Sequence, residues 1–214
     1  MSWGEVYKIN NNMKRSLNEQ LRDLMFRPLR IITTTGTYTP EKTGLYQVIC
    51  VGAGGSGQVW DSGNHYSAGG GGGGVAIKTI RLESTTSYNV TVSTTASFGN
   101  ILSATSGAGG STPTGGTASG GDYNFTGETG AKGSLKNDVY TVSRGGSVGV
   151  VISGLSRQIS YTTTSGTFHI YGEGILQYGG GGAATGSYNS GEDKWVEDAG
   201  QPAAVIIIPL EMEE

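Results

Sequence analysis

The run YQVICVGAGGSG, residues 46–57, has the spacing of a dinucleotide-binding loop. Apolar residues of an expected strand lead into Gly52, Gly54 and Gly57, the G-x-G-x-x-G arrangement that receives a pyrophosphate at a helix N-terminus. The motif works only if a helix begins after the last glycine and directs its free N–H groups at the phosphate. Here the chain continues QVWDSGNHYSAGGGGGG, which leaves no room for a helix. We therefore expect no nucleotide site.

Other catalytic and metal-binding patterns are weak. His65 stands among glycines and His169 inside an expected strand, and neither has a carboxylate or cysteine at metal-ligand spacing. The acidic pairs of GEDKWVED, residues 191–198, lack the alternating oxygens of a known calcium loop, so we interpret them as a solvated turn. A carbohydrate-cleaving enzyme is disfavoured, although paired acids can lie far apart in sequence. We expect no enzyme, no cofactor and no metal.

Bulky aromatic residues set among glycines are the remaining candidates for ligand contact. Such side chains either plug the domain beneath them or touch a ligand, and both interpretations stay open. Tyr and Trp offer a large contact area at low entropic cost and stack on sugars or apolar patches. The candidate receptor contacts are Trp60, His65, Tyr66, Tyr123, Phe125, Tyr188 and Trp195.

The glycine content sets the main structural question. The 214 residues include 39 Gly and 5 Pro, with 35% hydrophobic and 14% charged residues. If every glycine lay inside a regular element, the cost of about 0.5–1 kcal/mol each would exceed a typical net stability. We therefore expect glycines where only glycine fits: left-handed turns, close backbone contacts, or extended segments bonded to one another.

Charge and cysteine content exclude several classes. The formal net charge is −3, with a basic first 30 residues and an acidic C-terminus, but no basic stripe interleaved with aromatics indicates nucleic-acid binding. The single cysteine, Cys50, excludes an intrachain disulfide and fits folding in a reducing compartment. The longest apolar run, residues 203–208, is too short to span a bilayer, so we expect no membrane insertion.

Residues 1–30 are expected to form a separate attachment segment. The apolar positions Met13, Leu17, Leu21 and Leu24 recur at helical spacing, and Pro28 ends the pattern near Phe26. A helix of about four turns is marginal alone, so its apolar stripe needs a partner. That partner is its own β domain, another protein, or copies of itself.

Residues 31–214 are expected to form a glycine-rich β domain. The runs YQVICV and VAIKTIRL are typical of core strands, SYNVTV and TFHIY alternate, and SVGVVIS and AVIII are continuous enough to be buried on both faces. No helical pattern follows Pro28. We predict an all-β fold, either a β-sandwich or an irregular barrel.

Several segments, in order, resemble the glycine-rich domain of phage tail and tail-fibre proteins. These are TGTYTPEKTGLYQVICVGAGGSG, AGGGGGGVAIKTIRL, SYNVTV, SFGNILSATSGAGGS, QYGGGGAATGS and GQPAAVIIIPLE, which cover most of residues 31–214. The resemblance implies parallel polyglycine helices bonded to one another, with receptor contacts in the loops between them. Because residues 122–178 are poor in glycine blocks, we expect a sandwich carrying glycine-rich loops, polyglycine-II-like at most in part.

We therefore expect a non-enzymatic component of a virion or tail-like particle, assembled in the host cytoplasm. Residues 1–30 would attach it to other virion, tail or baseplate proteins, and the aromatic loops would contact a polysaccharide or protein receptor on the host cell. The alternative is a collar or capsid decoration protein with a purely structural role. Fibre proteins are often trimers and tip adhesins can be single copies, so a homotrimer and a monomer both stay open.

Overall fold

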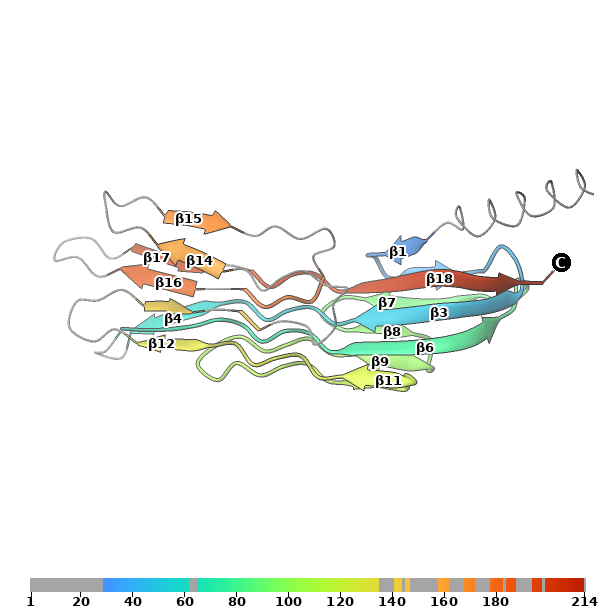
Figure 1. The fold of residues 1–214 in the computed structure, drawn as a ribbon, viewed down its shortest axis with the longest axis horizontal. Helices are drawn as coiled ribbons and strands as arrows, with labels where there is room; N and C mark the ends of the chain where they lie inside the picture. The colour runs from blue at the N-terminus through green and yellow to red at the C-terminus, as the bar shows by residue number, and fades with distance from the viewer. Residues whose placement is uncertain are drawn as a thin grey trace, which may run out of the picture.

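A computed structural model describes residues 29–61, 65–134, 141–143, 145–146, 158–161, 168–171, 178–182, 184–187, 194–197 and 199–213. These residues form strands and no helix, so the all-β prediction is confirmed for this part of the chain. The molecule is elongated, with two large sheets at one end and three small sheets at the other (Figure 1). The expected helix with Met13, Leu17, Leu21 and Leu24 lies outside the described residues.

The first large sheet, sheet A, is antiparallel with the strand order β1-β18-β3-β6-β11. Its strands are β1 (Arg30–Ile32), β18 (Ala204–Met212), β3 (Gly44–Val51), β6 (Val75–Leu82) and β11 (Tyr123–Phe125). Within β3, Val48 and Cys50 belong to one buried cluster, whereas Ile49 and Val51 belong to a second cluster. Alternate residues of the strand therefore bury both faces of the sheet, which explains the continuous apolar run.

The second large sheet, sheet B, packs on one face of sheet A. It is antiparallel with the order β10-β9-β8-β7-β2. Its strands are β10 (Ala118–Ser119), β9 (Leu102–Ala104), β8 (Ala96–Phe98), β7 (Tyr88–Val92) and β2 (Gly36–Tyr38). Phe98 is fully buried between the sheets, and its ring lies 5.2 Å from that of Tyr88 and 6.4 Å from that of Tyr38.

This arrangement confirms the sandwich and makes the barrel alternative wrong. The main core cluster joins Val48 of sheet A to Phe98 and Leu102 of sheet B. Sheet A ends at β1 and β11, and sheet B ends at β10 and β2, so the described strands close no barrel. An open two-layer packing results because the apolar faces of the two sheets bury each other.

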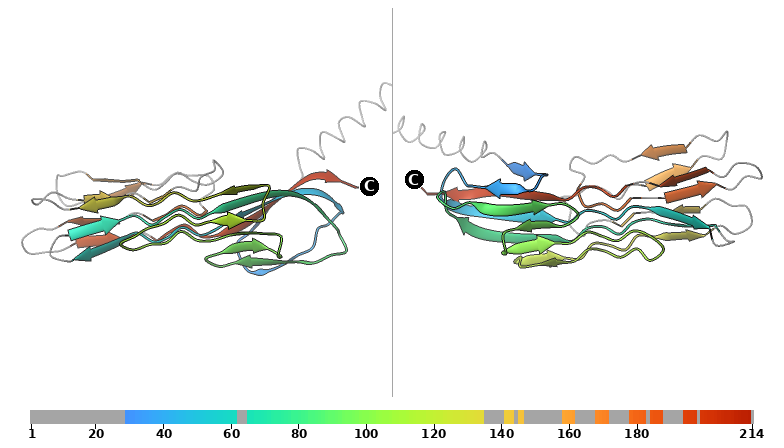
Figure 2. Two further views of the ribbon diagram at one scale, coloured as in Figure 1. Left: turned by 90° about the horizontal axis from the view of Figure 1, so that it is seen from below. Right: turned by 180° about the vertical axis from the view of Figure 1, so that it is seen from behind.

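Between the sandwich and the small sheets, glycine-rich segments run side by side along the long axis (Figures 1 and 2). Backbone N–H groups of each segment donate to carbonyl oxygens of neighbouring segments. We call this set the glycine bundle; it consists of segments 52–57, 69–74, 105–109, 114–117, 127–131, 145–146, 179–182 and 199–202.

Segment 69–74 lies at the centre of the bundle, and every third N–H of it donates to the same neighbour. Gly69 and Gly72 donate to segment 127–131, Gly70 and Gly73 to segment 179–182, and Gly71 and Gly74 to segment 105–109, at 2.7–3.0 Å. Its carbonyls accept from segments 52–57, 114–117 and 145–146. Three residues per turn is the period of the polyproline II helix, in which backbone groups point outward in three directions.

The glycine blocks are therefore ordered segments and not loops, which differs from the simpler expectation of a sandwich carrying glycine-rich loops. The neighbours also alternate in chain direction: Gly69 bonds to Ala131 and Gly72 to Glu128, so these two segments run antiparallel. The physical reason for the order is that each bonded amide of the extended chain gains a partner outside its own segment.

Close approach, and not backbone conformation, is what requires glycine at most bundle positions. Among the described glycines of the bundle, only Gly179 has a positive φ, of 73°. A Cβ added to Gly73 would overlap the carbonyl oxygen of Gly52, and one added to Gly107 would overlap that of Gly71. Any larger residue would push the segments apart and break the bonds between them.

Three small antiparallel sheets lie beyond the bundle. The first contains β12 (Lys132–Ser134), β5 (His65–Ala68) and β4 (Gln58–Asp61); the second contains β13 (Thr141–Ser143), β16 (Ala184–Ser187) and β17 (Lys194–Glu197); the third pairs β14 (Gln158–Tyr161) with β15 (Phe168–Tyr171). The strand expected in TFHIY is thus confirmed, whereas SVGVVIS at residues 147–153 lies outside the described residues.

Both ends of the described chain lie at the sandwich. β1 pairs with β18 so that Arg30 is opposite Ile207, and the C-terminus marks the end of the molecule remote from the small sheets (Figure 1). We call this end the root and the opposite end, with the three small sheets, the distal end.

Candidate functional site

The G-x-G-x-x-G motif is a bundle segment. The N–H groups of Gly52, Gly54 and Gly55 donate to the carbonyls of Gly74, Gln201 and Gly71 at 3.0, 2.9 and 2.8 Å. Strand β4 begins directly after Gly57, so the prediction that no helix follows the motif is confirmed. The amides that a nucleotide-binding loop would direct at a phosphate are therefore already engaged inside the protein.

The aromatic residues that follow this motif lie at the distal end. Trp60 is in β4 and stands opposite Tyr66 of β5 in the strand register, and Asp61 stands opposite His65. The expectation that these residues lie in loops was wrong, since they belong to two paired strands. Residues directly opposite each other in an antiparallel pair are neighbours, so one hairpin carries the first three candidates together.

Trp195 joins the same end from a distant part of the sequence. It lies in β17, opposite Gly186 of β16. Strand β16 contacts β4 and β5, and β17 contacts β4. The structure thus brings the strands of Trp60, Tyr66 and Trp195 into contact. Tyr188, the remaining candidate in this part of the chain, lies outside the described residues.

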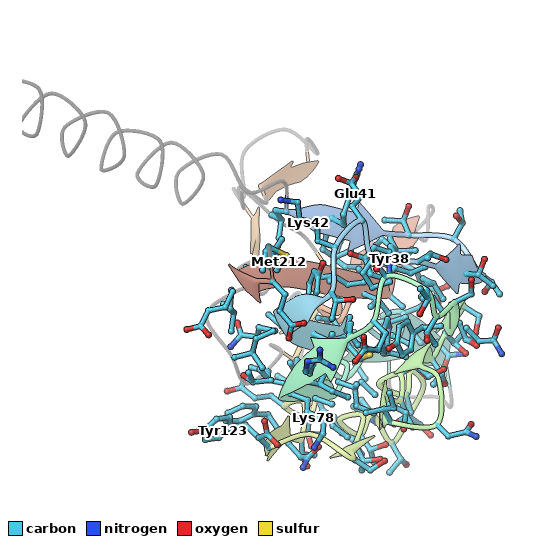
Figure 3. The ribbon with its side chains drawn as sticks, turned by 90° about the vertical axis from the view of Figure 1, so that its right-hand side faces the viewer. Tyr38, Glu41, Lys42, Lys78, Tyr123 and Met212 are labelled. Atoms are coloured by element: carbon cyan, nitrogen blue, oxygen red, sulfur yellow. The ribbon has the colours of Figure 1, made fainter. Side chains whose placement is uncertain are left out.

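Tyr123 and Phe125 lie elsewhere, in β11 at the edge of sheet A. Phe125 packs against the second core cluster, which contains Ile49 and Val75, and so it covers the outer face of the sandwich. Tyr123 is 66% exposed and is visible at the periphery when the root faces the viewer (Figure 3). The seven sequence candidates therefore do not form one surface.

A family model described as a glycine-rich domain matches residues 33–204. The chain belongs to this glycine-rich domain family. No curated protein matches it.

The expectation of close backbone contacts or of extended segments bonded to one another is confirmed by the bundle of this glycine-rich domain, and the sequence contains a signal for its arrangement. Gly127 and Gly130 are buried and three residues apart, while Glu128 and Thr129 between them are exposed. Gly52 and Gly55 repeat the same spacing. A G-x-x-G spacing places glycine at every turn on the inner side of a threefold helix.

The root of the glycine-rich domain has a hollow of about 390 Å³, lined by residues 30–32, 34–39 and 41. Four of these residues are threonines, and the guanidinium group of Arg30 donates to the Glu41 carboxylate at 2.9 Å across its exposed rim. None of the candidate aromatic residues lines this hollow.

Exposed ion pairs hold the strand ends at the root. The guanidinium group of Arg81 donates to both carboxylate oxygens of Glu213, at 2.8 and 2.7 Å, and these bonds lower the pKa of Glu213. Asp122 accepts from the Thr79 N–H at 2.9 Å and from Lys78 at 3.1 Å, and both donors lower its pKa. These groups fix the C-terminus and the start of β11 onto β6.

Buried titratable groups of the sandwich are held neutral. Burial raises the pKa of the Cys50 thiol to about 12, and this free cysteine is fully enclosed in the core. Burial likewise raises the pKa of Tyr38 to about 12, and Tyr46, whose hydroxyl donates to the Lys42 carbonyl at 2.7 Å, is shifted in the same direction. A thiol in this state is not a nucleophile.

Two further findings concern the described residues. They contain no group of three histidine, cysteine, aspartate or glutamate side chains close enough to hold a metal ion. Within the same ranges, no helix is long and apolar enough to cross a membrane.

Proposed function

We propose that this glycine-rich domain is a virion component of a phage tail or tail-like particle that contacts the host cell surface with its distal end. The observation that carries the proposal is the polarity of the molecule. Trp60, His65, Tyr66 and Trp195 lie on strands at the distal end, while both ends of the described chain lie at the root. A protein attached through its root would present these aromatics farthest from the particle.

The bundle supports this role because it supplies a stiff connection. Segment 69–74 is bonded to neighbours on all sides, so the distal hairpins are held in place before any ligand arrives. Less conformational entropy is then lost on binding, which favours affinity for a weakly attractive surface such as a polysaccharide.

Attachment through residues 1–30 completes the proposal. The described chain begins at Leu29, whose side chain is 47% exposed, directly before β1 at the edge of the sandwich. A segment that precedes this point starts from the root, which is the end suited to a partner on the particle. Residues 1–30 then anchor the protein to tail or baseplate proteins, as one copy or as a homotrimer, and no catalytic role is involved.

Receptor contact is tested with purified, fluorescently labelled protein on a panel of intact bacterial strains. We expect the combined variant Trp60→Ala, Tyr66→Ala and Trp195→Ala to lose most of the binding with little change in melting temperature. The matched control is Tyr123→Ala, which removes an exposed aromatic ring from the root and should bind normally. Equal loss in both variants, or a large drop in melting temperature of the distal variant, would contradict contact by the distal aromatics.

Attachment is tested by deleting residues 1–28, which leaves Arg30 in place opposite Ile207 in β1. The shortened protein should fold and bind cells but fail to enter particles, so normal incorporation would overturn this assignment. If particles lacking the whole protein adsorb normally yet break more easily, the collar or decoration role replaces the receptor-binding one. Release of short oligosaccharides from surface polysaccharide by purified protein would contradict a non-enzymatic role.

A further inference from the structure

The arrangement of glycine and larger residues in the bundle has a mechanical consequence. We propose that the bundle is a register lock: residues carrying a Cβ block its segments from sliding, so that the bundle transmits tension from the distal end to the root. This inference stands on the hydrogen bonds and the glycine positions alone and holds for any ligand at the distal end.

The blocking residues are clearest in segment 127–131. Gly127 faces segment 69–74 closely enough that a Cβ would overlap the Gly72 carbonyl oxygen, and a Cβ on Gly130 would overlap that of Gly69. A threefold helix rotates by a third of a turn per residue and advances about 3.1 Å. A slip of one residue that keeps the bonding pattern therefore replaces these two glycines by Glu128 and Ala131.

Neither replacement has room for its Cβ, so the slip is blocked sterically before the next register forms. A slip in the opposite direction brings in Thr126 and Thr129, which are also exposed residues with a branched Cβ. The same logic applies to segment 52–57, where Gly52 and Gly55 face inward and Ala53 and Ser56 stand beside them. Slips of one residue in either direction are therefore excluded for segment 127–131.

The direction of the hydrogen bonds makes the lock matter under load. The segments follow the long axis and their bonds join them side by side, so the bonds lie across that axis (Figure 2). A pull on segment 127–131 along the axis loads its bonds to segments 69–74 and 114–117 together. A pull between Leu29 and the C-terminus instead separates β1 from β18 at the edge of sheet A, where the hydrogen bonds break one after another.

Single-molecule pulling on the full chain tests this proposal in two geometries. The first attaches handles at Ser134→Cys, at the end of β12, and at the C-terminus. It pulls segment 127–131 toward the distal end, which drives Thr126 and Thr129 into the places of Gly127 and Gly130. The second uses Leu29→Cys and the C-terminus, which loads the β1–β18 pair. Cys50 does not interfere, because its thiol is buried. We expect a several-fold higher rupture force in the first geometry, since forced unfolding reports the barrier along the loaded path.

The decisive variant is the double substitution Thr126→Gly with Thr129→Gly, which removes both Cβ atoms that block a slip in this direction and leaves the backbone bonds Gly72–Glu128 and Gly69–Ala131 intact. Its control, Thr126→Ala with Thr129→Ala, removes the same two hydroxyl groups but keeps a Cβ at both positions. We expect the double variant to lose much of the rupture force in the first geometry and none of the rupture force in the second. The control should match the wild type in both geometries. An unchanged first force in the double variant, or an equal loss in the control, would overturn the register lock.

The second geometry also separates misfolding from unlocking. A double variant that folds correctly keeps the wild-type force between Leu29→Cys and the C-terminus. A parallel loss in both geometries means that the glycines destabilised the whole domain, and the lock would then be refuted as the origin of the first force.

Discussion

Replacing Gly181 by alanine should be one of the most damaging methyl additions in the molecule. A Cβ at this position would overlap the carbonyl oxygen of Gly70, and it would lie 2.7 Å from the Gly70 carbonyl carbon and 3.0 Å from the Gly146 nitrogen. Ordinary contacts of a Cβ begin at 3.4 Å. The surrounding groups are all backbone, so none can rotate out of the way and the segments themselves must separate.

The size of the effect follows from the bonds that converge there. The Gly181 N–H donates to the Gly146 carbonyl at 2.9 Å, Gly146 donates to Gly70 at 2.8 Å, and Gly70 donates to Gly182 at 2.8 Å. A buried donor or acceptor left without its partner costs about 1–3 kcal/mol. At a central cost of about 1.5–2 kcal/mol each, losing two or three bonds costs about 3–6 kcal/mol. Alanine also restricts the unfolded chain more than glycine does, which stabilises the folded state by about 0.4–1 kcal/mol. We expect a net loss of about 3–5 kcal/mol.

The preceding residue supplies the matched control. A Cβ at Gly180 would meet only the Gln201 Cγ, at 3.5 Å, and its φ is not in the left-handed region. Gly180→Ala should therefore be neutral or stabilise the protein by about 0.4–1 kcal/mol. Since about 1 kcal/mol corresponds to roughly 2–4 °C in a chain of this length, thermal unfolding should show a drop of roughly 6–20 °C for Gly181→Ala alone.

Equal melting temperatures for the two variants would refute this reasoning. The two variants have the same composition and change adjacent buried residues, and they differ in how close the added Cβ comes to the neighbouring backbone. A larger loss for Gly180→Ala would refute it as well. Either result would mean that the segments are not held in contact as the hydrogen bonds indicate.

Three further predictions concern the sandwich. Phe98→Ala should cost about 3–5 kcal/mol in urea unfolding, because the ring is fully buried between the two sheets. At alkaline pH the melting temperature should fall as pH rises from 9 toward 12, since the raised pKa values of Cys50 and Tyr38 favour the folded state only while both groups are neutral; Cys50→Ala should reduce this fall. The pKa of Asp122 is lowered in the folded state from 3.8, so its contribution exists above that pH and is lost in stronger acid; the small difference in melting temperature between Asp122→Asn and wild type should therefore disappear in an acid titration.

The strands of the sandwich core were predictable because their signal is local. Apolar runs such as Gly44–Val51 and Val75–Leu82 contain enough consecutive hydrophobic residues to identify buried strands without knowing their neighbours. The order of strands in each sheet was not predictable in this way, because β18 pairs with β1 and β3 from the other end of the chain.

The bundle was harder to predict because glycine has no side chain to show a polar or apolar pattern. Six consecutive glycines at residues 69–74 are equally compatible with a flexible linker and with a fully bonded extended helix. What distinguishes them is the outer segments, where Gly127 and Gly130 alternate with larger residues at a period of three. That period is visible in the sequence but has meaning only once several segments lie together.

The candidate site was only partly predictable for a topological reason. The chain crosses the bundle repeatedly, so the number of glycine segments between two residues decides whether they lie at the same end. Residues 58–61 and 65–68 lie between an outgoing and a returning segment and reach the distal end, as do residues 194–197. Tyr123 lies between returning segment 114–117 and outgoing segment 127–131, which keeps it at the sandwich. Composition alone placed all these aromatics in one set.

The same topology separates the requirements of folding from those of recognition. The bonds of the bundle join backbone groups, and its close contacts require only that inward positions lack a side chain. The distal strands are therefore held by their backbone pairing and by the glycine segments that lead into them. Such a scaffold suits the proposed role in surface contact, because backbone bonds and inward-facing glycines hold the bundle together and need no particular side chain at the distal end.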